Sequence, residues 1–228
     1  MIPFKAARKI EHTPVVTYLL IAINVLVFLW QMTLSETDLY TLYFRSGFVP
    51  CAGQASFAGA FTSMFLHGGF LHLAGNMIFL LAFGPAVEDY LGKFWYGAFY
   101  IAAGLAGAFL HMLFTWNVCI PAIGASGAIS GVMGGFLLLY PGTRIKTVAF
   151  FWGIPVGIRD VRSLYILGWF LIVELLNGIA TLGPKTAETG GVAVWAHVGG
   201  FALGFLMAFI AMTFKPLPPV DPIYLDGD

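Results

Sequence analysis

The sequence has little charge. Only 10% of its 228 residues are Asp, Glu, Lys or Arg, whereas a typical soluble domain has about 25%. Hydrophobic residues make up 59%, and the mean hydropathy is +0.87. This composition excludes an ordinary soluble domain, and the length suits a single compact membrane domain. The formal net charge of zero argues against a nucleic-acid partner.

Cysteines and metal-binding motifs are also scarce. The two cysteines, Cys51 and Cys119, fall in expected outer loops. In an oxidising compartment the two could pair, but one pair at long separation is a weak disulfide signal, so the sequence leaves their pairing open. The chain has no His-Glu-x-x-His motif, and zinc normally needs three or four ligands at recognisable spacing. We therefore expect no metal site.

Six apolar stretches come close to the length of about 20 residues that a helix needs to cross a bilayer. Lipid offers backbone groups no hydrogen-bond partner, so we predict an all-α membrane protein with six transmembrane helices. The predicted core at 13–214 has a short N-terminal segment at 1–12 and a C-terminal tail at 215–228. Thr13 and Ser163 are expected to cap the first and fifth helices. The six stretches are approximately residues 14–31, 57–83, 94–115, 124–140, 163–182 and 192–214.

The positive charges predict the orientation. With six crossings, nine of the eleven Lys and Arg residues lie on one side and only Arg45 and Lys185 on the other. Such an excess marks the cytoplasmic side, so both termini are predicted to be cytoplasmic. The loop at 144–162 has three aromatic residues between basic ends and could lie along the inner membrane surface. The nine residues are Lys5, Arg8, Lys9, Lys93, Arg144, Lys146, Arg159, Arg162 and Lys215.

In this orientation, three helices that are separate in sequence place polar residues at one depth. The second, fourth and sixth stretches all enter from the outer side, and their first turns hold the polar side chains. This clustering predicts a site in the outer half of the bilayer that opens toward the outer side. The residues are His67, His72 and Asn76, then Ser126, and then His197.

Ser126 and His197 are the candidate nucleophile and general base. A serine in a membrane helix is usually a packing residue, but Ser126 lies between Gly124 and Gly127 at a helix start. Unpaired backbone N–H groups there can stabilise an oxyanion. An intramembrane histidine is costly and is therefore a functional candidate. Small residues recur every four positions on both helices, and close packing of these faces would bring His197 to Ser126.

Glu174 is the one carboxylate within a predicted span, and no Asp or Glu is placed where it would orient His197. A Ser–His dyad is therefore the simpler prediction, and Glu174 is assigned a structural or gating role. His72 and Asn76, four residues apart on one helix face, are the candidate oxyanion hole. Ordinary interhelical hydrogen bonding is the alternative for this pair. His111 is expected to be structural.

Together these motifs resemble the rhomboid intramembrane serine proteases. The resemblance implies a dyad of Ser126 and His197, an oxyanion hole of His72, Asn76 and backbone N–H groups, and no metal or cofactor. It also implies cleavage of other membrane proteins in or near a transmembrane segment, with the fifth helix and the following loop as a lateral gate. The motifs are Gly124-Ala125-Ser126-Gly127, His67-x4-His72-x3-Asn76, Ala196-His197-x-Gly199-Gly200-x3-Gly204 and the Gly-Pro-Ala-Val-Glu-Asp-Tyr-Leu-Gly segment at 84–92.

The chain departs from the family pattern in two places. The Trp-Arg pair common in the first loop is absent, and Arg45 is the only basic residue of that loop. Ser130 stands where an aromatic residue often packs on the catalytic histidine. The orientation of the His197 ring is therefore expected to depend on other neighbours.

Two other interpretations compete. A catalytically silent relative that binds membrane clients would usually lack the serine or the histidine, and this chain keeps both. A solute transporter would often show two matching halves, and the sequence shows no such repeat. The sequence thus predicts an intramembrane serine endopeptidase in the inner membrane of a prokaryotic cell. Its expected partners are the lipid bilayer and membrane proteins with a transmembrane segment.

Overall fold

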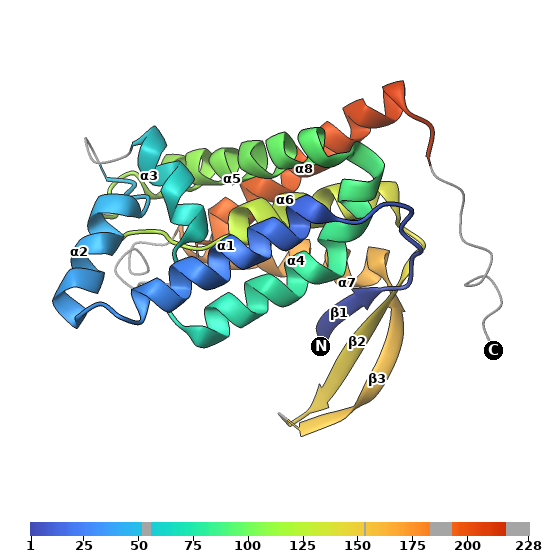
Figure 1. Cartoon of the computed structure of the whole chain (residues 1–228), viewed down its shortest axis with the longest axis horizontal. Helices are drawn as coiled ribbons and strands as arrows, with labels where there is room; N and C mark the ends of the chain where they lie inside the picture. Colours follow the sequence, from blue (N-terminus) through green and yellow to red (C-terminus); the bar gives the residue numbers. More distant parts are fainter. Residues whose placement is uncertain (52–55, 153, 183–192, 218–228) are drawn as a thin grey trace.

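The computed structural model describes residues 1–51, 56–152, 154–182 and 193–217. In this part of the chain the helices form an elongated bundle, and a small sheet lies at one end of it (Figure 1). The helices are α1 (Val15–Gln31), α2 (Glu36–Ser46), α3 (Phe57–Thr62), the single 3₁₀ turn η1 (Ser63–Phe65), α4 (Phe70–Leu91), α5 (Lys93–Thr115), α6 (Ser126–Leu139), α7 (Ser163–Ala180) and α8 (Val194–Phe214). The strands are β1 (Ile2–Ala6), β2 (Arg144–Phe151) and β3 (Ile154–Arg162).

Four of the described helices are long and apolar enough to cross a membrane, namely α4, α5, α7 and α8. Helices α1 and α6 are apolar but shorter. The chain is therefore a multi-pass membrane protein, and the count of six spans stays a prediction. Five of the six predicted stretches match a helix to within two residues at each end.

Helix α6 lies at the centre of the bundle, and glycines determine its packing against α8. Eleven of its 14 residues are buried. An added Cβ on Gly200 or Gly204 of α8 would overlap the backbone carbonyl oxygen of Gly127 or Gly131 of α6. Hydrocarbon gives helices no hydrophobic reason to associate, so close van der Waals contact between small residues holds them together. The predicted small-residue faces of these two helices are confirmed.

The second predicted stretch, 57–83, is not one helix. The chain forms α3 and η1, leaves helical geometry at Leu66, and resumes as α4 only at Phe70. Polar His67 and two glycines occupy the break. A hydropathy pattern averages over such a short interruption, and the true membrane helix begins later and ends later, at Leu91.

This longer α4 contains two acidic residues that bind the start of α1, so the expectation that Glu174 is the one carboxylate within a span is wrong. The Glu88 carboxylate accepts hydrogen bonds from the backbone N–H groups of Val16 (2.8 Å) and Thr17 (2.7 Å) and from the Thr17 hydroxyl (2.8 Å). Asp89 accepts the backbone N–H groups of residues 11 and 12. The first-turn N–H groups of a helix lack hydrogen-bond partners within it. Here the carboxylates of α4 are the acceptors for the start of α1.

The two predicted helix caps are wrong in detail. Pro14, not Thr13, occupies the N-cap of α1, without a side-chain cap. Arg162 occupies the N-cap of α7. The Ser163 hydroxyl instead donates to the backbone carbonyl of Tyr140 at 2.5 Å. It therefore connects the start of α7 to the end of α6.

The loop at 144–162 and the first residues of the chain form an antiparallel sheet in the order β1-β2-β3. Ile2 pairs with Val148, and Lys146 pairs with Asp160. The expectation of an all-α chain is wrong for this segment. Residues 144–149 alternate between half-buried and buried positions, and this period of two is the signal of a strand. The sheet lies at the end of the bundle where α1 begins (Figure 1).

Candidate active site

Ser126 is the first residue of α6, and the chain reaches it through Gly124. This glycine has φ +123°, in the region that disfavours residues with a Cβ. An added Cβ there would lie 2.8 Å from both Nε2 and Cε1 of the His72 ring. Conformation and space therefore both require glycine two residues before the serine. The helix start leaves backbone N–H groups without intrahelical partners beside the Ser126 hydroxyl.

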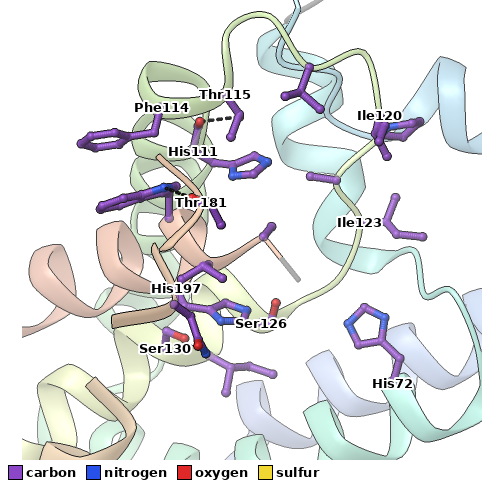
Figure 2. A pocket seen from close by; sticks show the side chains of 18 of the residues that line it. His72, His111, Phe114, Thr115, Ile120, Ile123, Ser126, Ser130, Thr181 and His197 are labelled. Atoms are coloured by element: carbon purple, nitrogen blue, oxygen red, sulfur yellow. Dashed lines mark hydrogen bonds between the residues drawn. The ribbon is translucent and has the colours of Figure 1, made fainter. Parts of the chain in front are cut away.

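Ser126 and His197 line one cavity of about 1250 Å³. His197 lies in the first turn of α8, and its side chain is 9% exposed. The neighbours of these two residues, Gly127 and Ala196, pack closely: a Cβ added to Gly127 would lie 3.4 Å from the carbonyl oxygen of Ala196. Figure 2 shows His197 and Ser126 drawn together, with His72 on the far side of Ser126 in this view. Nε2 of His197 is buried and has no hydrogen-bond partner within the described residues.

A carboxylate does orient His197, which corrects the sequence-based expectation. Nδ1 of His197 lies 2.9 Å from Oε2 of Glu174 on α7. One turn earlier on α7, the ring of Phe170 packs against the imidazole with centroids 6.2 Å apart and planes tilted by 37°. The four-residue spacing of Phe170 and Glu174 was a visible signal that they share a face. The sequence did not say that this face turns toward α8.

The aromatic contact explains how the site tolerates Ser130. This residue is only 2% exposed within α6, so the position common for an aromatic residue in the family is a tightly packed one here. Phe170 supplies the ring contact to His197 from a different helix. The expectation that other neighbours orient the histidine is confirmed.

The structure also brings His72 and Asn76 to the site. Asn76 Nδ2 lies 3.6 Å from the position that a Cβ on Gly124 would take, next to the His72 ring. Asn76 Nδ2 donates a hydrogen bond to Nε2 of His67 at 3.0 Å. His67 is fully buried, and the Gln31 side chain hydrogen-bonds both its backbone N–H and its carbonyl. His67 therefore holds the Asn76 amide rather than facing the cavity.

His111 lines the same cavity, although the sequence indicated only a structural role. Its Nδ1 is buried and has no hydrogen-bond partner in the part of the chain that the structure describes. In Figure 2 its ring faces the open space above Ser126. No sequence signal indicated this position, because His111 belongs to no motif and its place depends on how α5 packs.

Cys51 and Cys119 form a disulfide bond, a pairing that the sequence left open. Close by, Phe48 and Ala122 exchange two backbone hydrogen bonds of 3.0 and 2.8 Å. Both links attach the segment after α2 to the segment that precedes Ser126. The sequence could not decide the pairing, because a 68-residue separation says nothing about distance in space.

Comparison with known proteins decides the family. Residues 54–214 match the family model described as the Rhomboid domain. This chain belongs to the rhomboid family. The match covers α3 to α8 and so includes every residue of the site described above.

Several curated proteins of the rhomboid family are similar to this chain. The Rhomboid protease GluP of Bacillus subtilis is 35% identical over 197 residues, which is 86% of this chain and 34% of the relative. Rhomboid protein 1, mitochondrial, of Saccharomyces cerevisiae is 30% identical over 220 residues, 89% of this chain and 58% of the relative. RHOMBOID-like protein 4 of Arabidopsis thaliana is 33% identical over 147 residues, 64% of this chain and 32% of the relative.

This rhomboid chain spans about a third to three-fifths of the length of these relatives. They come from a bacterium, a yeast and a plant, and one is named as mitochondrial. The chain is therefore an integral membrane protein of the rhomboid family. The comparisons do not support the predicted prokaryotic inner membrane over other membranes.

Proposed function

We propose that this rhomboid protein is an intramembrane serine endopeptidase that hydrolyses peptide bonds in or near transmembrane segments of other membrane proteins. One observation carries the proposal. His197, whose buried Nε2 has no hydrogen-bond partner among the described residues, lines the same cavity as Ser126. A base with a free nitrogen next to a serine at a helix start is the arrangement that nucleophilic acyl transfer needs.

In the proposed reaction, Nε2 of His197 takes the proton from the Ser126 hydroxyl as the serine oxygen attacks the scissile carbonyl carbon. The tetrahedral intermediate collapses when His197 gives this proton to the leaving amine nitrogen, and an ester remains on Ser126. Water, deprotonated by the same nitrogen, then attacks the ester. This step releases Ser126 and the second product as a carboxylic acid.

The oxyanion of each intermediate needs hydrogen-bond donors that are already in place. The start of α6 offers backbone N–H groups. Asn76 has two N–H bonds on Nδ2 and uses one on His67, so the second is available to substrate. The His72 ring, against Gly124, is the remaining candidate donor. We assign the oxyanion hole to these groups.

We further propose that the core at 13–214 crosses the membrane six times, with both termini cytoplasmic and the site opening toward the outer side. Basic residues of β2 and β3, such as Arg144 and Arg159, lie in the sheet at the far end from α2 and α3 (Figure 1). Excess positive charge favours the cytoplasmic side. The Cys51–Cys119 bond lies on the side of the site, and disulfides persist in oxidising compartments. Lys185 and most of the tail at 215–228 lie outside the described residues.

The test uses the full chain in detergent and a fluorophosphonate probe, whose phosphorus a nucleophilic serine attacks with loss of fluoride. We expect labelling of the wild type and none of the Ser126→Ala or His197→Ala variants. The matched control is Ser35→Ala, which changes an exposed serine before α2 and should be labelled as the wild type is. Labelling that persists in a folded Ser126→Ala variant would refute the proposal. A folded wild type without labelling would favour a silent relative that binds membrane clients.

A further inference from the structure

Glu174 hydrogen-bonds His197 and is not among the described residues that line the cavity. Its Oε2 is 2.9 Å from Nδ1 of His197, and the two side chains are 12% and 9% exposed. The described residues that line the cavity include His72 and His111 but no Asp, Glu, Lys or Arg. Glu174 is therefore the nearest source of negative charge to the imidazole within the described chain.

The contact bears on which nitrogen of His197 carries a hydrogen. A carboxylate in its ionised form only accepts hydrogen bonds, so an ionised Glu174 requires Nδ1 to donate and leaves the lone pair on Nε2. Nε2 is the nitrogen without a partner in the described structure. It is also the nitrogen that must take a proton from Ser126. The contact with an ionised Glu174 is thus compatible with the tautomer that a general base requires.

We propose that Glu174 is a positioning residue for His197. Its carboxylate holds the tautomer with the free Nε2 and stabilises the imidazolium that forms when His197 takes the serine proton. The inference rests on the proposed function, because it assigns a role within that reaction. With Glu174 on α7, the Ser126–His197 pair becomes a group of three residues, in which the carboxylate orients the histidine.

Phe170 supports this role from the same helix. It lies four residues before Glu174, so both side chains leave the same face of α7. The Phe170 ring lies beside the imidazole with centroids 6.2 Å apart, and Glu174 hydrogen-bonds its Nδ1. One helix thereby fixes both the tilt and the tautomer of His197. This arrangement replaces the aromatic contact that Ser130 cannot make.

In a merely structural role, Glu174 would only attach α7 to α8 through its hydrogen bond with His197. The two roles predict different results for Glu174→Gln, which keeps the size of the side chain and removes its charge. For a positioning residue, the maximal rate of fluorophosphonate labelling falls by on the order of 10²- to 10⁴-fold, as it does when the carboxylate of a serine-protease triad is replaced. The half-saturating probe concentration and the melting temperature stay unchanged, because the cavity and the fold are intact.

Two further variants sharpen the test. Glu174→Asp keeps the charge on a shorter side chain and is expected to recover part of the lost rate. Glu36→Gln makes the same chemical change at an exposed position of α2 and should label at the wild-type rate. A Glu174→Gln variant that labels as fast as the wild type would overturn the proposal. Rates that fall only in step with the melting temperature would do the same.

A second measurement separates this inference from the proposed function. In protein labelled with ¹⁵N at histidine, the His197 signals are those that disappear in His197→Ala. We expect a protonated Nδ1 and an unprotonated Nε2 in the wild type, and a changed or mixed tautomer in Glu174→Gln. A wild type that shows the correct tautomer but no labelling would refute the proposed function alone. A hydrogen on Nε2 in the neutral wild-type ring would refute the role of Glu174.

Discussion

The Glu88→Gln substitution tests how α1 is attached to the rest of this rhomboid protein. The Glu88 carboxylate is 2% exposed and accepts three hydrogen bonds of 2.7–2.8 Å, two of them from the first-turn backbone N–H groups of Val16 and Thr17. In glutamine, one oxygen becomes an NH₂ group that can only donate. At least one backbone N–H of α1 then faces another donor in a buried place.

The magnitude follows from these bonds. A hydrogen bond to a charged group contributes about 1.5–3 kcal/mol, and the variant loses one or two of the three. Part of the loss is offset, because a neutral amide is cheaper to bury than a carboxylate. We expect the free energy of unfolding to fall by about 2–4 kcal/mol. For a chain of this size, this corresponds to a decrease in melting temperature of roughly 4–16 °C.

The assay is thermal unfolding of the full chain in detergent, followed by tryptophan fluorescence. Glu36→Gln is the matched control, because Glu36 is exposed in the first turn of α2 and its charge contributes at most about 1 kcal/mol there. Equal melting temperatures for the two variants would refute the reasoning. In that case the acidic pair of α4 would not anchor α1.

Two further predictions concern the packing and the disulfide. Gly200→Ala is expected to lower the free energy of unfolding by about 3 kcal/mol, since the new methyl group overlaps the Gly127 carbonyl oxygen. Gly168→Ala, which meets nothing within 4 Å, should be neutral or stabilising by about 0.5–1 kcal/mol in the same melting experiment. A reducing agent is expected to lower the melting temperature of the wild type but not of the Cys51→Ser/Cys119→Ser double variant, and closure of a 68-residue loop sets an upper value of about 4 kcal/mol. A wild-type melting temperature that does not change on reduction would contradict the prediction for the disulfide.

The helices that the sequence predicted well are those whose limits are set by the solvent. A run of apolar residues long enough for the bilayer has few alternatives to a helix, and five stretches were placed closely for this reason. The break at His67 is short, so it escaped a pattern that averages over many residues. Strand β1 was not predicted, because it pairs with β2, for example Ile2 with Val148, far along the chain. Its five residues alone carry no signal for this pairing.

The site divides in the same way. Ser126 and Gly124 were predictable, because local backbone geometry at a helix start requires a small residue there. The partner of His197 was not, because it depends on the rotation of α7 about its own axis, and that rotation is set by packing over the whole bundle. Glu174 was noticed as a carboxylate in the membrane, but its direction could be learned only from the three-dimensional structure.

The contact between α6 and α8 has a consequence for biosynthesis. Helix α8 is the last helix in the described chain, and its glycines complete the surroundings of α6. A growing chain that has already inserted Ser126 still lacks His197 and the wall of the cavity that α8 forms. The first residues likewise wait for β2 before β1 can pair. Under the proposed mechanism, an unfinished chain therefore holds a serine without its base, and it would not cleave its neighbours in the membrane during synthesis.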